Sequence, residues 1–264
     1  MILNKKNINK LISLSSEAGN LIREIYITDF DVKIKEDQSP LTLADSASNK
    51  IITDFLKVFT PNIPILSEEG EKITLEERLS WNQYWLIDPL DGTKEFIKRN
   101  NEFTVNIALI NNNLPILGII HSPISREVFW GSQGFGSFYI DKNGNERKIK
   151  VKKHANQKIK VASSRSHSAA EHELIQKYNP KYELVVKGSS LKFCLVALGE
   201  ADIYIRNGPT SEWDTAAGHA IVKFAGGNVL TLQKKELKYN LKESLLNPPF
   251  VAGNIELIES FIDN

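Results

Sequence analysis

The sequence predicts a mixed helix-and-sheet protein, with an α+β first half followed by an α/β second half. Two helical patterns open the chain of 264 residues, short β-branched and aromatic runs follow them, and strands then alternate with helical segments. Hydrophobic residues make up 41% and charged residues 25% of the chain, so the composition is that of an ordinary globular protein and excludes disorder, collagen and coiled coil.

The first half is predicted to place a pair of helices on an antiparallel sheet. Apolar residues recur every three or four positions from Ile8 to Ile25, which is the period of a helix. A second helix is expected after Thr42, a good N-cap, and Pro61 lies just beyond its end. The expected strands are Tyr84–Ile87, Thr104–Ile110, Leu114–His121 and Glu127–Trp130, with a hairpin turn at Asn111-Asn112-Asn113.

The second half is predicted to begin in a basic stretch. Residues 141–160 contain eight Lys+Arg and two acidic residues, a run most typical of a solvated hairpin face. We place the domain boundary there, between an N-terminal α+β metal-binding domain over 1–145 and a C-terminal α/β domain over 146–264. Beyond it, expected strands at 158–162, 183–186, 202–205 and 228–230 alternate with expected helices near 168–178, 189–199 and 214–225.

Charge and cysteine content exclude several kinds of partner. The net charge of +1 lacks the basic excess of a protein that holds nucleic acid. The one cysteine, Cys194, permits no intrachain disulfide and no thiolate metal site, which fits a reducing compartment. The apolar runs fall short of the ~20 residues that span a bilayer, so no transmembrane segment is expected.

A short acidic motif is the first candidate site. Asp88 follows an apolar strand, and Pro89 is expected to force a tight turn that brings Asp88, the Leu90 carbonyl and Asp91 to one cleft. These hard oxygen ligands suit Mg²⁺ or Mn²⁺. On the motif alone, a structural Asp-Pro turn in which Asp91 caps a short helix is an equal alternative.

Further carboxylates favour the metal site if they converge on the same cleft. Asp45 is expected in the first turn of the second helix, Glu68 follows an apolar run, and Asp214 precedes the helix expected from Thr215. Two carboxylates about 4 Å apart repel by roughly 4 kcal/mol, so a cluster of them needs cations. Asp214 is equally well placed to serve as the N-cap of its helix.

Taken together, these motifs resemble the inositol monophosphatase superfamily of Mg²⁺-dependent, lithium-sensitive phosphatases. The superfamily pattern has an early Thr-x-x-Asp, a Glu-Glu pair, Asp-Pro-hydrophobic-Asp-Gly-Thr and a late Trp-Asp. The chain has these at Thr42–Asp45, Glu68-Glu69, Asp88–Thr93 and Trp213-Asp214. Residues 88–100, 188–204 and 208–218 are closer to the bacterial CysQ-type 3'(2'),5'-bisphosphate nucleotidase branch. The resemblance extends over nearly the whole chain and implies a layered αβαβα sandwich.

The resemblance also implies roles for individual residues. Glu68, Asp88, the Leu90 carbonyl, Asp91 and Asp214 would hold about two or three Mg²⁺ ions. Asp45 and Thr93, together with Glu68, would be catalytic, with Asp45 and Thr93 positioning or deprotonating the attacking water. Substrate would contact Glu68, Leu90, Asp91, Gly92, Thr93, His167, Ser189, Lys192, Arg206 and Asp214, and the nucleotide would be recognised by Ser189, Lys192, Arg206 and His167.

The implied reaction removes the 3'-phosphate of adenosine 3',5'-bisphosphate, a by-product of sulfate activation, to give AMP and phosphate. The implied location is cytoplasmic; relatives associate peripherally with the inner membrane, although no anchor is visible here. The alternatives are a phosphatase of the same fold that acts on inositol phosphate or another sugar phosphate, and a non-catalytic nucleotide sensor. The oligomeric state is left open.

Overall fold

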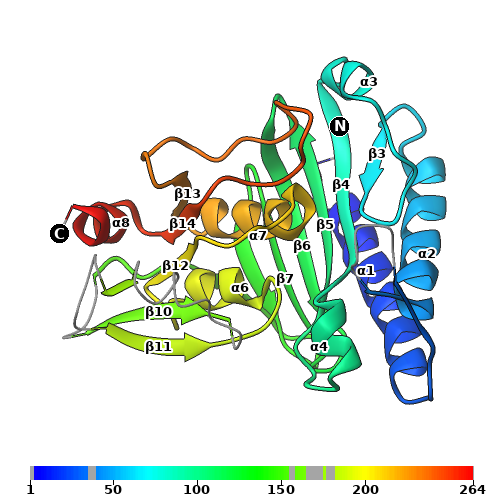
Figure 1. The fold of residues 1–264 in the computed structure, drawn as a ribbon, viewed down its shortest axis with the longest axis horizontal. Coiled ribbons are helices and arrows are strands. Elements are labelled where there is room, and N and C mark those ends of the chain that lie inside the picture. Colours follow the sequence, from blue (N-terminus) through cyan, green and yellow to red (C-terminus); the bar gives the residue numbers. More distant parts are fainter. Residues whose placement is uncertain (1–2, 35–39, 155–157, 165–174, 177–181, 264) are drawn as a thin grey trace.

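The elements of the chain stack in layers (Figure 1). The structure is a computed structural model, and it describes residues 3–34, 40–154, 158–164, 175–176 and 182–263. Two helices cover one face of a seven-stranded sheet, two more helices lie between that sheet and a five-stranded sheet, and a last helix packs on the second sheet. The layered αβαβα sandwich predicted from the resemblance is therefore confirmed. His167 and all of the predicted helix near 168–178 except residues 175–176 lie outside the described residues.

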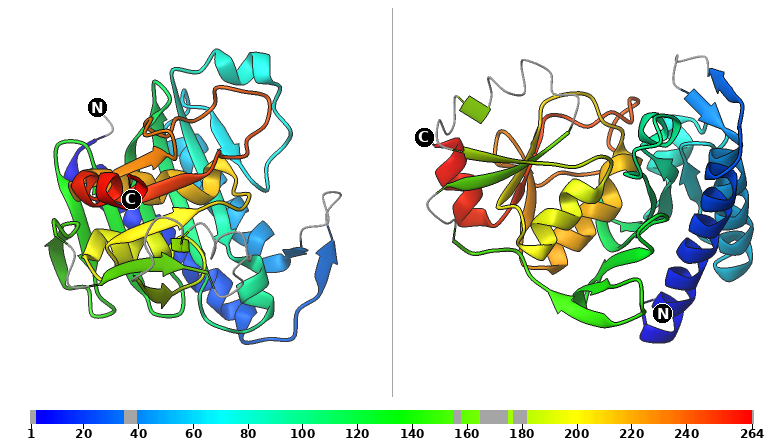
Figure 2. Two further views of the ribbon diagram at one scale, coloured as in Figure 1. Left: turned by 60° about the vertical axis from the view of Figure 1, so that its left-hand side comes forward. Right: turned by 90° about the horizontal axis from the view of Figure 1, so that it is seen from below.

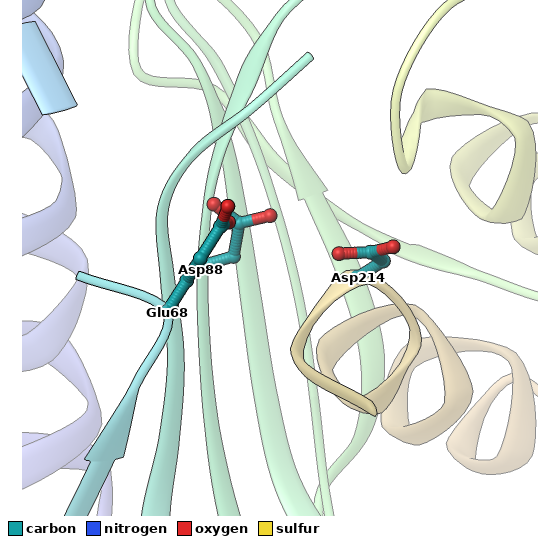
Figure 3. A group of neighbouring side chains, drawn as sticks. All are labelled: Glu68, Asp88 and Asp214. Atoms are coloured by element: carbon teal, nitrogen blue, oxygen red, sulfur yellow. The ribbon is translucent and has the colours of Figure 1, made fainter. Parts of the chain in front are cut away.

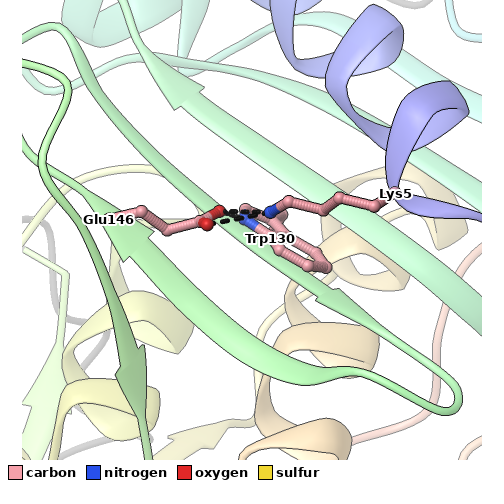
Figure 4. Close-up of polar contacts among 3 residues, drawn as sticks. All are labelled: Lys5, Trp130 and Glu146. Atoms are coloured by element: carbon pink, nitrogen blue, oxygen red, sulfur yellow. Dashed lines mark hydrogen bonds and ion pairs between the residues drawn. The ribbon is translucent and has the colours of Figure 1, made fainter.

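The outer helical pair consists of α1 (Lys5–Tyr26) and α2 (Leu43–Phe59), as predicted. The buried side of α1 includes Ile8, Leu11, Ala18 and Ile22, which recur at helical spacing and pack against the large sheet. At the start of α1, the Lys5 ammonium lies 2.7 Å from the Glu146 carboxylate and 4.3 Å from the centre of the Trp130 ring (Figure 4). This contact joins the first turn of α1 to the far edge of the sheet.

The large sheet is an antiparallel meander with one parallel strand added at its edge. Its order is β3-β4-β5-β6-β7-β8-β9, and only β3 pairs in parallel. The predicted meander is confirmed, but β3, β8 and β9 were not among the predicted strands. The edge strand β9 is mostly exposed, in keeping with a solvated hairpin face. The strands are β3 (Ile65–Ser67), β4 (Gln83–Asp91), β5 (Thr104–Asn111), β6 (Leu114–Ser122), β7 (Glu127–Ser132), β8 (Gly136–Ile140) and β9 (Glu146–Ile149).

Shorter elements flank this sheet at both of its ends, with α3 (Leu75–Leu79) where β4 begins and α4 (Thr93–Ile97) where β4 ends (Figure 1). The two-stranded β1 (Val32–Ile34) and β2 (Pro40–Thr42) precede α2, α3 lies between β3 and β4, and α4 follows β4 directly. Gly92 is the N-cap of α4 with a φ of +91°, a conformation that a residue with a side chain rarely adopts. The turn between β4 and α4 therefore depends on a glycine.

The middle helices, α6 (Leu191–Leu198) and α7 (Glu212–Phe224), pack between the two sheets (Figure 2). The approach of α7 to β6 is close, since a Cβ at Gly118 would lie 2.3 Å from the carbonyl oxygen of Ala217. One hydrophobic cluster runs from the large sheet through both helices to the second sheet. The halves of the chain thus share a core, and the division into two domains near 145 stays a prediction.

The second sheet is mixed, with the order β11-β10-β12-β14-β13. The predicted alternation of strands and helices is present, but the last strand and helix were not predicted. The elements are β10 (Ile159–Ser163), β11 (Tyr182–Val186), β12 (Ile203–Arg206), β13 (Asn228–Thr231), β14 (Phe250–Gly253) and α8 (Ile255–Ile262). Within the described ranges, no helix has both the length and the apolar character needed to cross a bilayer.

Two local predictions were wrong in detail. The strand before Asp88 does not end in a tight turn: β4 continues through Pro89 to Asp91, and the pairing with β5 shifts register between the two aspartates. Proline lacks an N–H, so it interrupts the ladder locally and leaves a bulge. The N-cap of α7 is Ser211 rather than Asp214, which is the third residue of the helix and accepts a 2.8 Å hydrogen bond from the Ser211 N–H.

Candidate active site

The first turn of α2 brings Asp45 to Thr93. One carboxylate oxygen of Asp45 accepts hydrogen bonds from the Thr42 N–H at 2.8 Å and the Thr42 hydroxyl at 2.6 Å. The bond from the Thr42 N–H is half of a capping box, in which the Thr42 side chain in turn accepts a backbone N–H of the first helical turn. The other oxygen lies 3.1 Å from the Thr93 hydroxyl. Burial raises the pKa of Asp45, and the bonds from Thr42 and Thr93 oppose that rise. The two residues predicted to act on water thus form a pair.

The bulge in β4 directs Asp88 and Asp91 to the same end of the sheet. Asp88 is buried, and one of its oxygens accepts the Leu90 N–H at 3.0 Å. The Pro89 carbonyl accepts the Ser48 hydroxyl at 2.7 Å, which ties the bulge to α2. The Leu90 carbonyl lies 3.3 Å from the Thr93 hydroxyl and so faces the same site. The predicted Asp-Pro motif therefore forms a bulge, and this bulge places the oxygens of Asp88, Leu90 and Asp91 at one end of the strand.

Three carboxylates from three segments converge beside this bulge. Glu68 from the end of β3, Asp88 from β4 and Asp214 from α7 each offer an oxygen, and these oxygens lie within 4.8 Å of one another (Figure 3). Burial and the charge of Glu68 raise the pKa of Asp88 well above its usual range, and burial and the charge of Asp91 do the same for Asp214. A bound cation would offset the repulsion in such a cluster, so these three carboxylates form a candidate cation site.

Asp91 joins the carboxylates to the second half of the chain. Its Oδ2 accepts the Ser189 hydroxyl and the Ser190 N–H, both at 2.5 Å. Two weaker contacts come from the large sheet, with Asn106 Nδ2 at 3.4 Å and Thr104 Oγ1 at 3.5 Å. Ser190, Asn106 and Thr104 were not predicted as site residues, because no local pattern marks a contact between residues so far apart in the sequence.

A cavity of about 340 Å³ opens on these carboxylates and is also lined by cationic residues. Asp91 and Asp214 line it together with Ser189, Lys192 and Arg206. Lys192 is only 6% exposed, and its ammonium donates to the Ser189 carbonyl at 2.6 Å. The predicted site residues Glu68, Asp88, Leu90, Asp91, Gly92, Thr93, Asp45, Asp214, Ser189, Lys192 and Arg206 thus gather around one region, while His167 lies outside the described residues.

A second cavity of about 670 Å³ borders the carboxylates from another side. Glu68 and Asp214 line it together with Arg78, Trp213 and Glu243. Asp214 belongs to the walls of both cavities, so both cavities reach the carboxylate cluster. Sequence reasoning assigned no role to Arg78 or Glu243.

Comparison with known proteins identifies the family. The sequence model of the inositol monophosphatase family matches residues 4–260, almost the entire chain. The chain belongs to the inositol monophosphatase family. Among its curated relatives is the 3'(2'),5'-bisphosphate nucleotidase CysQ of Escherichia coli K12, which is 44% identical over 245 residues that cover 92% of this chain and 98% of the relative. CysQ of Haemophilus influenzae is 35% identical over 252 residues, covering 95% and 94%.

Solved structures of the family share the fold. CysQ from Bacteroides thetaiotaomicron superposes with a TM-score of 0.84 at 37% identity, covering 96% of this chain and 99% of that one. The inositol monophosphatase of Thermotoga maritima superposes with a TM-score of 0.79 at 25% identity, covering 98% and 97%.

The residues present fit the metal dependence of inositol monophosphatase family phosphatases. The cluster of Glu68, Asp88 and Asp214 supplies only oxygen ligands. Asp88 and Asp214 each use one oxygen to accept a backbone N–H. A second oxygen then remains on Asp88 and on Asp214 for an ion. This hard, charged ligand set suits a divalent cation such as Mg²⁺ or Mn²⁺.

Proposed function

We propose that this chain is a Mg²⁺-dependent 3'(2'),5'-bisphosphate nucleotidase that hydrolyses the 3'-phosphate of adenosine 3',5'-bisphosphate to AMP and phosphate. The observation that carries the proposal is a single cavity lined both by the carboxylates Asp91 and Asp214 and by the cationic side chains Lys192 and Arg206. A substrate with two phosphates can place one at the carboxylates, through bound cations, and the other at the cationic side chains. The names of the CysQ relatives support the same activity.

The proposed ligands of Mg²⁺ are Glu68, Asp88, the Leu90 carbonyl, Asp91 and Asp214, for about two or three ions. When bound, Mg²⁺ supplies neutralisation of the phosphate charge and activation of water. The protein contributes the geometry: the bulge in β4 fixes Asp88, the Leu90 carbonyl and Asp91, and the capping box of α7 fixes Asp214. No protein nucleophile is needed.

Asp45 and Thr93 are proposed to orient the attacking water and take its proton. The Thr93 hydroxyl lies 3.1 Å from Asp45 and 3.3 Å from the Leu90 carbonyl, so its hydrogen is directed to one of these acceptors. The lone pairs of the hydroxyl are then available to a water. Because burial raises the pKa of Asp45, this carboxylate is a stronger base than an exposed aspartate.

The phosphate that stays on the product is proposed to bind Lys192 and Arg206. Arginine can pair with phosphate through two donors, and a lysine ammonium adds a mobile charge. Ser189 and Gly92 line the same cavity and would contact the substrate. The contribution of His167, the cytoplasmic location, the peripheral membrane association and the link to sulfate activation stay predictions.

The experiment that tests this function compares three substrates in parallel. Phosphate release would be measured with Mg²⁺ from adenosine 3',5'-bisphosphate, inositol 1-phosphate and fructose 1,6-bisphosphate. We expect the highest kcat/KM on the nucleotide. Activity confined to the sugar phosphates would reject the proposal and favour a sugar phosphatase, and binding of the nucleotide without any hydrolysis would indicate a sensor.

A further inference from the structure

Residues 239–247, which we call the strap, lie across the N-terminus of α7. The Glu212 N–H donates to the Leu245 carbonyl at 2.8 Å, and the Asn247 N–H donates to the Thr210 carbonyl at 2.7 Å. The Asn247 side chain adds a 2.7 Å bond to the Ser211 carbonyl. The strap is therefore fixed to the turn that begins the helix of Asp214.

The other side of the strap holds a buried arginine from α3. Arg78 is 2% exposed, and its guanidinium donates to the Asn240 side-chain oxygen at 2.6 Å and to the Glu243 carbonyl at 3.0 Å. Asn240 returns a 2.7 Å bond from its side-chain amide to the Arg78 carbonyl. Removing an arginine from water costs several kcal/mol, which these bonds must offset. The strap is therefore hydrogen-bonded to α3 as well as to the start of α7.

Asn240 continues the connection to α7 through its backbone. Its N–H donates to the carboxylate of Glu212 at 2.8 Å, and Glu212 is itself 1% exposed. Asn240 has a φ of +57°, which asparagine and glycine tolerate better than other residues. A buried chain of contacts thus runs from Arg78 through Asn240 to Glu212.

This chain of contacts joins the two segments that carry two of the clustered carboxylates. Glu68 precedes α3 in the chain, and Asp214 stands two residues after Glu212. Arg78, Glu68 and Asp214 also line the same 670 Å³ cavity. Because the clustered carboxylates repel one another, their spacing has to be imposed by the surrounding contacts.

We propose that Asn240 is a positioning residue that holds the Glu68 and Asp214 segments at the separation that divalent cation binding requires. This inference rests on the metal site of the proposed function. Asn240 acts through its bonds to Arg78 and Glu212, and it has no role in the reaction itself. Residues that orient metal ligands in this way commonly change metal affinity by about 10–100-fold when they are replaced.

The test compares Asn240→Gly with Lys5→Met. Glycine keeps the positive φ and the N–H bond to Glu212 but removes both side-chain bonds to Arg78. Lys5→Met removes a partly exposed polar contact, with Glu146 on β9, at the opposite edge of the large sheet from β3. It serves as the control for the loss of a polar contact far from the carboxylates. The Kd for Mg²⁺ would be measured by isothermal titration calorimetry without substrate, well below the melting temperatures.

We expect Asn240→Gly to weaken Mg²⁺ binding about tenfold, with KM for the nucleotide at saturating Mg²⁺ unchanged, and Lys5→Met to bind Mg²⁺ like the wild type. Wild-type Mg²⁺ affinity in Asn240→Gly would overturn the inference, whatever its stability.

Arg78→Lys, which keeps the charge but loses the planar fork, gives the same comparison if the glycine variant does not fold. A wild-type protein that binds Mg²⁺ but hydrolyses only sugar phosphates would overturn the proposed substrate and leave this comparison valid, whereas one that binds no divalent cation would overturn both.

Discussion

The Thr93 hydroxyl lies 3.1 Å from a carboxylate oxygen of Asp45, although 48 residues separate the two in the sequence. Asp45 is held by the capping box of α2, and Thr93 is the first residue of α4. The pair therefore depends on two helix starts that meet at the bulge of β4. If this pair activates water, its removal should affect the rate of the reaction far more than the binding of substrate.

Thr93→Val is expected to lower kcat by about 10²-fold or more and to leave KM nearly unchanged, because valine has the shape of threonine without the hydroxyl. Thr93→Ser is the matched control and should retain most of the activity. Asp45→Asn should lose a comparable factor in kcat and also about 1 kcal/mol of stability, since it weakens the capping box. Steady-state kinetics at saturating Mg²⁺ would measure kcat and KM for these variants. A kcat for Thr93→Val near that of the wild type would show that the pair does not activate the water.

Lys192→Ala is expected to raise KM for adenosine 3',5'-bisphosphate about tenfold or more, because a hydrogen bond to a charged group contributes about 1.5–3 kcal/mol. The KM for a monophosphate substrate should change much less. Lys94 lines the same cavity but is exposed, so Lys94→Ala is the matched control and should have a small effect. Equal increases in KM for both substrates would exclude Lys192 from the site of the second phosphate.

Asp88→Asn is expected to stabilise the metal-free protein while it abolishes activity. Burial and the neighbouring carboxylates raise the pKa of Asp88, so its ionised form is disfavoured in the folded state at neutral pH. A neutral amide relieves the repulsion, and we expect a gain of about 1–2 kcal/mol in the free energy of unfolding in EDTA. Thermal unfolding would show a higher melting temperature for the variant in EDTA and stabilisation by Mg²⁺ for the wild type. A less stable variant in EDTA would argue against repulsion in the cluster.

The stability of the protein should fall in mild acid through buried histidines. Burial lowers the pKa of His121 to about 4 and that of His219 to about 3. A histidine with a depressed pKa in the folded state gives its full contribution above its ordinary pKa of about 6.5, and that contribution is lost as the pH falls toward the folded value. At pH 5 the loss is about 2 kcal/mol for each histidine.

Urea unfolding of the wild type, His121→Gln and His154→Gln between pH 7.5 and 5.0 would test this. His121→Gln should lose about 2 kcal/mol less than the wild type over this range. His154 is exposed, and His154→Gln is the matched control for replacing a histidine at the surface. Identical slopes for all three proteins would show that the pKa of His121 is not depressed.

Features encoded within a few residues were predictable from the sequence. The helical pair, the antiparallel meander and the acidic motif around Pro89 each depend on local patterns. The sequence predicts that Pro89 ends its strand, whereas the pairs of β4 with β5 on both sides of the bulge continue the strand to Asp91. Ser211 stands three residues before Asp214, which is the spacing of a capping box, so a signal for the true N-cap was present.

Contacts between distant residues could not be predicted in the same way. Asp91 and Ser190 are 99 residues apart, and Arg78 and Asn240 are 162 apart. Neither pair stands in a local pattern, because these contacts follow from how the two sheets pack on α6 and α7. The residues that support the carboxylates therefore became visible only in the folded chain.

The central claim is that the carboxylate cluster takes the 3'-phosphate while Lys192 and Arg206 hold the 5'-phosphate. The most direct measurement identifies the nucleotide product by ³¹P nuclear magnetic resonance after incubation of adenosine 3',5'-bisphosphate with the protein, with Mg²⁺ and with EDTA. We expect adenosine 5'-monophosphate with Mg²⁺ and no reaction in EDTA. Release of adenosine 3'-monophosphate, or hydrolysis that persists in EDTA, would contradict the account.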